Sequence, residues 1–311
     1  MGSIMRDSIA GSHPLSLGQK VFFMGGCPLT KEQQGTLCIL GAAVCYSIGG
    51  VCMKLIPWGG VAINCGRTAI ATVVISLYLL LTRHRLRLNP WIFLGALAVS
   101  GTNVLFCVAN KMTTAANAIV LQFTAPIFVI LFSLLFFHKK PRRLDLGACI
   151  LVFCGVLCFF VDGLSEGNSL GNLVALLSGA CYAGVFLLYE FPDSDPISSV
   201  FWGDVISAVT GLPFLLRETD FSATALTSLL VLGVFQVACA YILMTEGLKT
   251  TPPVTASLVS GIEPVLNPTL VALFYREYMG PTAFIGAVMV IGGVVAYNVL
   301  LRRQPKELIP Q

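Results

Sequence analysis

The stretches GTLCILGAAVCY at residues 35–46 and GNLVALLSGACY at residues 171–182 are two copies of one apolar segment. Both begin with glycine and end with Cys-Tyr, and they lie 136 residues apart. The correspondence continues along the chain at an offset of 138, which relates Pro126 to Pro264. A period this long is far beyond that of solenoid repeats, so it indicates a half-protein that was copied once and fused.

The composition places both copies in lipid. Hydrophobic residues make up 56% of the chain and charged residues only 11%, against about 25% charged residues in globular domains, and the mean hydropathy is +0.85. A helix needs about 20 apolar residues to cross the hydrocarbon, whereas a barrel strand needs about 10. The sequence therefore predicts an all-α membrane protein with ten transmembrane helices. The ten apolar runs are residues 36–55, 61–82, 91–110, 114–137, 144–161, 170–189, 197–216, 223–245, 254–275 and 282–301.

Five spans in each copy predict an inverted repeat. Because five is odd, the second copy enters the membrane from the opposite side, and the two five-helix units are related by an axis in the membrane plane. Such a pair can adopt two mirror-related conformations around a shared site, which is the architecture of alternating access. We expect the first unit at residues 35–162, the second at 169–301, and short tails at 1–34 and 302–311.

Lysine and arginine predict that both tails are cytoplasmic, because basic residues are retained on that side. With this orientation fourteen basic residues lie in inner segments and three in outer loops. The inner residues are Arg6, Lys20, Lys31, Arg83, Arg85, Arg87, Lys139, Lys140, Arg142, Arg143, Lys249, Arg302, Arg303 and Lys306, and the outer ones are Lys111, Arg217 and Arg276. Residues 1–34 contain no long apolar run typical of a signal peptide. The sequence predicts a multi-pass protein of the cytoplasmic (inner) membrane.

Two equivalent prolines mark the middle of the fourth and ninth spans. Pro126 and Pro264 each remove the helical hydrogen bond to the carbonyl four residues earlier, which would free the carbonyls of Gln122 and Ser260. One freed carbonyl and one polar side chain from each half could form a substrate or ion contact. The alternative is a packing kink satisfied by neighbouring helices or water.

The ninth span carries polar residues that the fourth lacks. Glu263 lies deep in the span, where an acidic side chain costs about 2.5 to 3.5 kcal/mol on insertion scales. Proton coupling, binding of a substrate amine or a structural ion pair would each justify it. Asn267 and Pro268 are expected to disrupt the helix again one turn further on.

Two charged residues occupy related positions in the second and seventh spans. Arg67 could reach Glu263 with its long side chain, or could extend to the outer interface instead. Asp204 matches Arg67 at an offset of 137, but the inversion places it toward the inner side, so we expect no direct pair and a position facing the inner vestibule.

Five further side chains complete the candidate lining. Tyr46 and Tyr182 are equivalent in the first span of each copy, Asn103 and Tyr241 in the third, and Trp202 precedes Asp204 by two residues. For the aromatic residues, packing in the core or at the interface is the competing interpretation.

No cofactor, metal or nucleotide site is predicted. The three histidines lie outside the spans or at their rims, and no Gly-Lys dipeptide is present, so a phosphate-binding G-x-x-x-x-G-K-[ST] loop is excluded. The expected partners are a small-molecule substrate, membrane lipid and a proton as coupling ion, with no nucleic acid, and the expected assembly is a monomer or homodimer. We expect no enzymatic activity.

These residues together resemble the drug/metabolite transporter superfamily, and within it the EamA-type family of ten-helix proteins. The resemblance covers about residues 35–301. Its motifs are Leu232-Gly233, the run Gly247-Leu248-Lys249-Thr250-Thr251-Pro252, Glu263-Pro264 and Arg276-Glu277-Tyr278. It implies that four helices of each unit surround a central substrate cavity while the fifth and tenth helices pack outside. The first unit departs from the pattern, with Ala125 in place of the glutamate.

The resemblance implies transport of small metabolites, amino acids or drugs without ATP. The leading hypothesis is therefore a secondary transporter that works by alternating access, with export as the expected direction. A channel-like facilitator of small solutes is the first alternative, and an intramembrane enzyme is a remote one.

Overall fold

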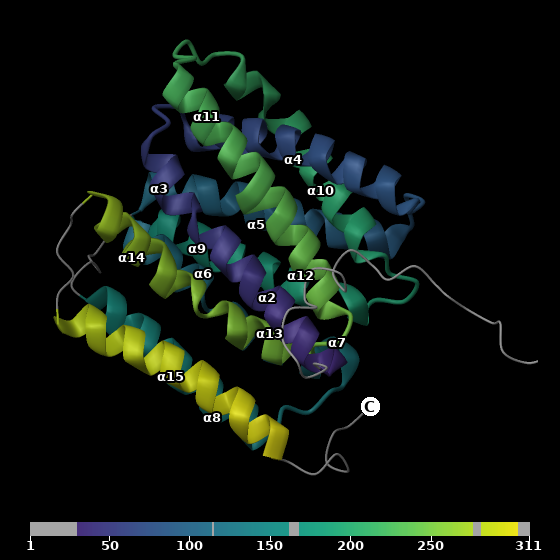
Figure 1. Cartoon of the computed structure of the whole chain (residues 1–311), viewed down its shortest axis with the longest axis vertical. Coiled ribbons are helices and arrows are strands. Elements are labelled where there is room, and N and C mark those ends of the chain that lie inside the picture. The colour runs from purple at the N-terminus through teal and green to yellow at the C-terminus, as the bar shows by residue number, and fades with distance from the viewer. Residues whose placement is uncertain (1–29, 114, 162–167, 276–280, 304–311) are drawn as a thin grey trace, which may run out of the picture.

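The computed structural model describes residues 30–113, 115–161, 168–275 and 281–303, and these ranges contain helices and no strand (Figure 1). The all-α prediction is confirmed for them. Eight helical stretches are long and apolar enough to cross a membrane, so the count of ten crossings stays a prediction. The tails at 1–29 and 304–311, the loop at 162–167 and Arg276-Glu277-Tyr278 lie outside the described residues.

Each half of the chain follows the same order of helices. The first half contains α2 (Lys31–Ser47), α3 (Gly49–Lys54), α4 (Gly60–Thr82), α5 (Pro90–Met112), α6 (Ala115–Gln122), α7 (Ala125–Phe137) and α8 (Arg143–Phe160). The second contains α9 (Ser169–Phe186), the 3-10 helix η2 (Leu188–Glu190), α10 (Pro196–Leu215), α11 (Ala223–Val231), the π-helical η3 (Leu232–Cys239), α12 (Ala240–Leu248), α13 (Pro253–Ser260), α14 (Glu263–Tyr275) and α15 (Pro281–Arg303).

Side chains at the helix starts explain where two of these helices begin. Thr30 accepts a hydrogen bond from the backbone N–H of Gln33, whose side chain accepts one from the backbone of Thr30, and this capping box starts α2. Asn89 caps α5 in the same way by accepting from the N–H of Ile92, and Pro90 occupies the first helical position, where a missing N–H costs nothing.

Equivalent helices of the two halves run antiparallel. At one end of α4 and α10, His84 Nε2 lies 2.7 Å from Asp195 Oδ2. At the other end, the backbone N–H of Gly59 donates to Glu218 Oε1 at 2.9 Å. The start of α4 therefore meets the end of α10. An antiparallel arrangement of equivalent helices is the geometry of an inverted repeat.

Helices α8 and α15 form an outer pair. They pack chiefly on each other and touch the rest of the bundle through α6, α13 and α14, and Figure 1 shows them along one edge of the molecule. They too are antiparallel equivalents, because Tyr297 near the end of α15 donates to Asp145 near the start of α8 at 2.8 Å. This agrees with what the resemblance implied for the fifth and tenth helices.

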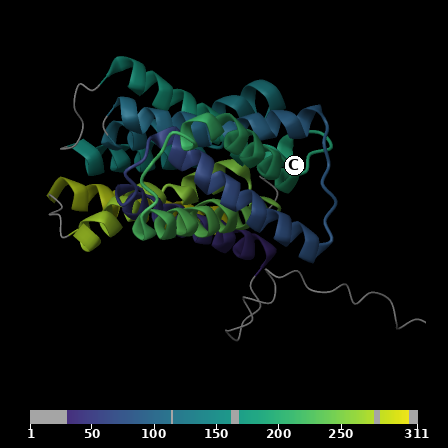
Figure 2. The same ribbon diagram turned by 90° about the horizontal axis from the view of Figure 1, so that it is seen from above.

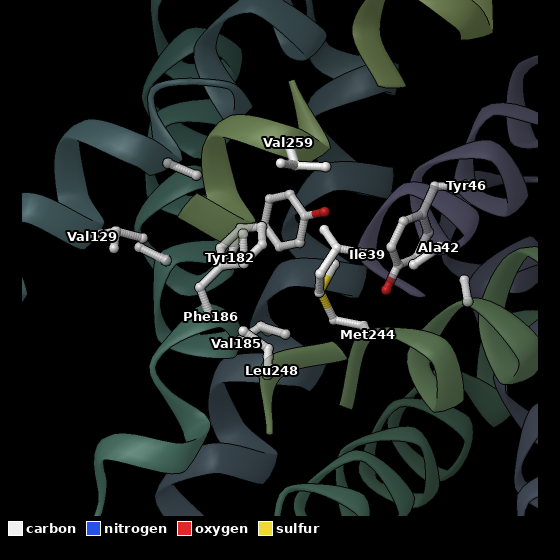
Figure 3. Close-up of a cluster of buried hydrophobic side chains, with 14 of the residues drawn as sticks. Ile39, Ala42, Tyr46, Val129, Tyr182, Val185, Phe186, Met244, Leu248 and Val259 are labelled. Atoms are coloured by element: carbon white, nitrogen blue, oxygen red, sulfur yellow. The ribbon is translucent and has the colours of Figure 1, made fainter. Parts of the chain in front are cut away.

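The first helix of each half packs into the opposite half. Helix α2 contacts α12, α13 and α14, while α9 contacts α5, α6 and α7. The view at right angles shows the result as one continuous bundle of roughly aligned helices (Figure 2). The hydrophobic core is correspondingly shared, with Ile39 from the first half beside Met244 from the second (Figure 3).

The glycines that open the two repeated segments lie at these crossings. A Cβ atom on Gly171 would come within 2.8 Å of the backbone of Met112, and one on Gly35 within 2.9 Å of the carbonyl oxygen of Gly247. Both distances are too short for a carbon atom. The repeated segment thus begins with glycine because the helices approach each other there at backbone distance.

Both halves contain a broken helix at equivalent positions. Helix α6 ends at Gln122 and α7 begins at Ala125, while α13 ends at Ser260 and α14 begins at Glu263, again at the offset of 138. The prolines thus lie in the first turn of a new helix, where proline is well tolerated. The prediction of a second disruption at Asn267 and Pro268 is wrong, since α14 runs without interruption from Glu263 to Tyr275. A helix tolerates such a proline when the freed backbone groups find other partners.

A glycine beside the first break should be needed for stability. A Cβ atom on Gly179 would lie 2.8 Å from the carbonyl oxygen of Gln122 and 3.0 Å from that of Leu121, both of them backbone atoms. We expect Gly179→Ala to lower the free energy of unfolding by about 1 to 3 kcal/mol, the usual cost of overpacking. The measurement is thermal unfolding of the purified protein in detergent.

Gly292→Ala is the matched control for that experiment. It adds the same methyl group within a helix, but no atom lies within 4 Å of the added carbon. Its melting temperature should match or exceed that of the unmodified protein, because alanine also favours the helix by up to about 1 kcal/mol. Equal melting temperatures for the two variants would show that α9 can shift away from the break.

Candidate substrate cavity

A small polar cavity lies between the two halves. Its volume is about 40 Å³, which is room for a few water molecules. Helices of both halves contribute to its wall, and the lining residues are Tyr46, Arg67, Thr102, Asn103, Phe106, Gln122, Tyr182, Gln236, Val237, Tyr241 and Glu263.

Arg67 is the positive charge of this cavity. Its side chain is buried, with 2% of its surface exposed, because every residue from 62 to 68 of α4 is buried. Extension to the outer interface is therefore ruled out. Among the described residues, no carboxylate oxygen of an Asp or Glu lies within 4 Å of a guanidinium nitrogen of Arg67, so Arg67 forms no ion pair there. A buried guanidinium that forms no ion pair is costly and attracts an anionic group.

Neutral oxygen and sulfur atoms hold Arg67 in place. Its Nε and Nη2 donate to Asn64 Oδ1 at 3.2 and 2.9 Å, and its Nη1 donates to Gln236 Oε1 at 2.8 Å. Nη2 also lies 3.5 Å from Cys107 Sγ. Asn64 is one turn before Arg67 on the same helix, so α4 and η3 together fix the plane of the guanidinium.

The partner Gln236 belongs to the π-helical segment η3. Its counterpart in the first half, α5, is an uninterrupted α-helix, so the two halves differ here. Extended π-helical turns are rare and occur frequently at functional sites. In this chain the segment brings the Gln236 side chain against Arg67.

Glu263 is the negative group of the cavity. It is the first residue of α14, directly after the break in the ninth span, and it is half-buried. The hydroxyl of Tyr182 donates to Glu263 Oε2 at 3.5 Å. Free N–H groups at a helix start favour a carboxylate, so the break places an acid where the helix end supports it. The equivalent residue of the first half, Ala125, offers no such group.

Three tyrosines connect the sides of the cavity. The ring of Tyr46 meets those of Tyr182 and Tyr241 edge to face, with centroids 6.5 and 5.7 Å apart. Figure 3 shows Tyr46 on α2 and Tyr182 on α9, reaching the same core from the two halves. The Tyr46 hydroxyl has no hydrogen-bond partner among the described residues, and that of Tyr241 donates to Asn103 Oδ1 at 3.5 Å.

Asp204 lies behind the cavity wall. It is fully buried, so the expectation that it faces an inner vestibule is wrong. Its Oδ1 accepts a long hydrogen bond of 3.5 Å from Asn103 Nδ2, and its Oδ2 has no partner among the described residues. No ion pair within 4 Å joins it to Arg67, in agreement with the sequence expectation. The carboxyl group of Asp204 thus does not line the cavity but contacts the lining residue Asn103 from behind.

The structure brings together seven of the thirteen residues that the sequence singled out. Those lining the cavity are Tyr46, Arg67, Asn103, Gln122, Tyr182, Tyr241 and Glu263. Four others, Pro126, Ser260, Pro264 and Asn267, lie at or beside the helix breaks without lining it. Trp202 lies elsewhere, because its Nε1 donates to the carbonyl oxygen of Arg87 at 3.2 Å, in the connection before α5.

Sequence reasoning missed five residues of the site. Thr102, Phe106, Gln236 and Val237 line the cavity, and Asn64 holds Arg67. Gln236 could have been found by the comparison that identified Glu263, because it replaces the first-half Ala98 at the offset of 138. Asn64 could have been found from its spacing of three residues before Arg67, which places both on one helix face.

The donor set suits an organic solute rather than a metal ion. Within the described ranges, no group of three His, Cys, Asp or Glu side chains is placed to hold a metal. One guanidinium, one carboxylate, three amides and three phenol rings offer charge, hydrogen bonds and apolar faces. Small-molecule sites typically combine such groups.

Comparison with known proteins identifies the family. The model of the EamA-like transporter family matches the chain twice, over residues 33–161 and 169–299. The chain is 28% identical over 226 residues to the uncharacterized transporter YwfM of Bacillus subtilis, which covers 69% of this chain and 75% of YwfM. It is 24% identical over 258 residues to the threonine/homoserine exporter RhtA of Salmonella typhimurium, which covers 80% of this chain and 85% of RhtA.

A crystal structure shares the fold. It superposes with a TM-score of 0.76 at 17% identity, over 88% of this chain and 100% of its own. The family and the named relatives are transporters rather than enzymes. Since the two family matches together cover most of its length, this chain belongs to the EamA-like transporter family of the drug/metabolite transporter superfamily and is a multi-pass membrane transporter.

Proposed function

We propose that this protein is a secondary transporter that exports small zwitterionic metabolites, above all amino acids, across the cytoplasmic membrane by alternating access. The observation that carries the proposal is that Arg67, which forms no ion pair, and Glu263 line one cavity between the two halves. Arg67 would bind the substrate carboxylate, since a guanidinium matches its two oxygens. Glu263 would bind the ammonium group.

The relatives support this class of substrate. RhtA of Salmonella typhimurium is named as a threonine/homoserine exporter, and both of those solutes carry a carboxylate and an ammonium group. The phenol ring of Tyr46 and the methyl groups of Val237 would contact the rest of the substrate. Export is the direction that this likeness favours.

We propose the membrane arrangement of ten crossings with both tails in the cytoplasm. Contacts between helix ends support the assignment of several loops to one common side of the membrane. Lys139 Nζ lies 2.6 Å from Glu190 Oε2, and the hydroxyl of Tyr78 near the end of α4 donates to Glu246 Oε1 at 3.2 Å. Since His84 after α4 contacts Asp195 in the loop before α10, the end of α4, this loop and the connection after α7 meet at one end, which carries most of the basic residues. The positive-inside rule assigns this end to the cytoplasm.

The breaks α6–α7 and α13–α14 would be the moving parts. The cavity of about 40 Å³ has room for a few water molecules, so we expect the halves to separate on one side when a substrate enters. Each break adjoins a helix from the opposite half, α9 or α2. Tilting of α7 or α14 about its break would therefore open one face while the other stays closed.

Protons would supply the driving force through a membrane-embedded acid. Glu263 faces the cavity and can exchange a proton for a substrate ammonium group as the site changes sides. Asp204 is a second acid, connected to the cavity through Asn103. Substrate and proton would thus compete for one carboxylate, which couples their movements in opposite directions.

Counterflow in proteoliposomes tests this function. Purified protein is reconstituted in liposomes loaded with unlabelled threonine, and uptake of radiolabelled threonine is followed. A carrier that alternates access should show saturable uptake and transient accumulation above equilibrium. Uptake that is linear in concentration and shows no counterflow would instead indicate the facilitator, and glycine betaine, a zwitterion without an N–H group, should not compete.

A further inference from the structure

A second, much larger hollow lies on the outer surface of the bundle. Its volume is about 750 Å³, and it lies between α5, α7 and α9. Five of its lining residues are exposed, and none of them also lines the central cavity. The lining residues are Trp91, Leu94, Leu97, Ala98, Phe132, Phe136, Phe137, Ala180, Cys181, Gly184, Leu187, Glu190, Phe191 and Pro192. We call it the lateral groove.

Small residues form the floor of the lateral groove and large apolar residues its walls. Helices α5 and α9 pack so closely there that a Cβ atom on Gly184 would lie 2.9 Å from that of Ala98. From Ala180 in α9 to Leu187 directly after it, the floor advances by seven residues, which is about 10 Å at the rise of a helix. An elongated apolar slot of this length fits part of an acyl chain.

Aromatic rings and one ion pair mark one end of the lateral groove. Trp91 stacks on Phe191 with centroids 5.9 Å apart, and Phe191 meets Phe137 at 5.7 Å. Glu190 is the one acidic residue of the lining, and Lys139 neutralises it at 2.6 Å. Tryptophan at a helix start and a neutralised acid are typical of the membrane interface.

Four basic residues lie close in sequence to lining residues at this end of the groove. Arg85 and Arg87 precede α5, whose Trp91 lines the groove. Lys140 follows α7, whose Phe137 lines it, and Arg143 is the first residue of α8. All four are exposed, and none has an ion pair within the described ranges. An apolar slot with cationic side chains in the adjoining connections is complementary to a lipid with an anionic headgroup.

We infer that the lateral groove is a binding site for an anionic phospholipid. One acyl chain lies along the floor of α9 and α5, and the phosphate group contacts the basic residues after α7, Lys140 and Arg143. Its headgroup then bridges the connections before α5 and after α7, and so fixes the end of α7 that lies opposite the helix break. This site is separate from the central cavity and does not depend on the proposed transport function.

Native mass spectrometry with defined lipids tests the inference. The full-length protein is delipidated in detergent and titrated with dioleoylphosphatidylglycerol or dioleoylphosphatidylcholine. The anionic lipid should be retained more tightly, by about five-fold for each basic side chain that contacts it. Equal retention of the two lipids would overturn the assignment of an anionic headgroup.

Charge variants locate the headgroup. The double variant Lys140→Gln, Arg143→Gln should lose most of the preference for phosphatidylglycerol over phosphatidylcholine. Arg217→Gln is the matched control, because Arg217 is also exposed but follows α10 at the opposite end of the bundle, and it should keep the preference. If the preference for phosphatidylglycerol falls equally in the double variant and in Arg217→Gln, it depends on the net charge of the protein and not on a site at the groove.

A filling variant locates the acyl chain. Ala180→Leu places a larger side chain into the floor of the lateral groove and should reduce retention of both lipids about ten-fold. Ala69→Leu is its control, since Ala69 is exposed on α4 and does not line the groove. Undiminished retention in Ala180→Leu would show that the chain lies elsewhere, provided that both variants elute as the unmodified protein does in size-exclusion chromatography.

Discussion

Replacement of Arg67 with lysine is expected to abolish threonine counterflow even though the positive charge is kept. The guanidinium is held at once by Asn64 Oδ1 and Gln236 Oε1, and an ammonium group is too compact to keep both bonds and bind a carboxylate in the bidentate manner. Truncating one partner of a buried charged hydrogen bond costs about 2 to 5 kcal/mol, or a factor of about 30 or more in affinity.

Stability separates a binding role of Arg67 from a structural one. An unpaired buried charge costs free energy, and replacing buried charged groups with apolar residues of similar volume is often neutral or stabilising by about 1 to 4 kcal/mol. We therefore expect Arg67→Met to abolish counterflow while its melting temperature stays equal or rises. A large fall in melting temperature would show that Arg67 serves the packing of α4 and η3. Arg217→Met, a change at an exposed arginine, should affect neither measurement.

Glu263→Gln is expected to remove the proton dependence of transport. Glutamine keeps the shape and the contact with Tyr182 but cannot bind and release a proton. In proteoliposomes with an imposed proton gradient, the unmodified protein should accumulate threonine against its concentration gradient when the proton gradient runs in the opposite direction. Glu263→Gln should lose this accumulation, about ten-fold or more, and any remaining exchange should not depend on pH.

Two other acids make that experiment decisive. Asp204→Asn tests the acid behind the cavity wall, and loss of coupling there with coupling retained in Glu263→Gln would transfer the coupling role to Asp204. Glu246→Gln is the control, because Glu246 contacts Tyr78 at the end of the bundle and does not line the cavity. An unchanged pH profile in both Glu263→Gln and Asp204→Asn would exclude proton coupling through either acid.

The elements of the fold that the sequence predicts well are those that depend on local rules. The duplicated segments, the apolar runs and the two prolines each involve residues within one span or its copy. The breaks at Gln122 and Ser260 occur where Pro126 and Pro264 place them, because a proline cannot donate to the preceding turn wherever the helix lies. The second break was wrongly expected for the same reason, since local chemistry allows a kink at Pro268 but does not require one.

The direction in which a polar side chain points followed no local rule. Helices in this chain are apolar on nearly every face, so the sequence contains no polar stripe that would mark the inner side. Arg67 and Asp204 are equivalent by sequence offset, yet one lines the cavity and the other is buried behind it. Trp202 lies two residues from Asp204 but contacts the connection before α5.

The sequence by itself determined an all-helical membrane protein made of two copies, with a break in the fourth and ninth spans and an acid in the second copy only. Composition, periodicity and the missing N–H of proline are properties of the chain alone. Only the tertiary structure decided that α2 and α9 each pack into the opposite half and that Asn64 and Gln236 hold Arg67. It also decided that the lateral groove lies between α5, α7 and α9. The physical reason is that helix rotation and crossing are set by packing between segments that can lie more than 100 residues apart. A single close approach, such as that of Gly35 to Gly247, fixes the orientation of a whole helix.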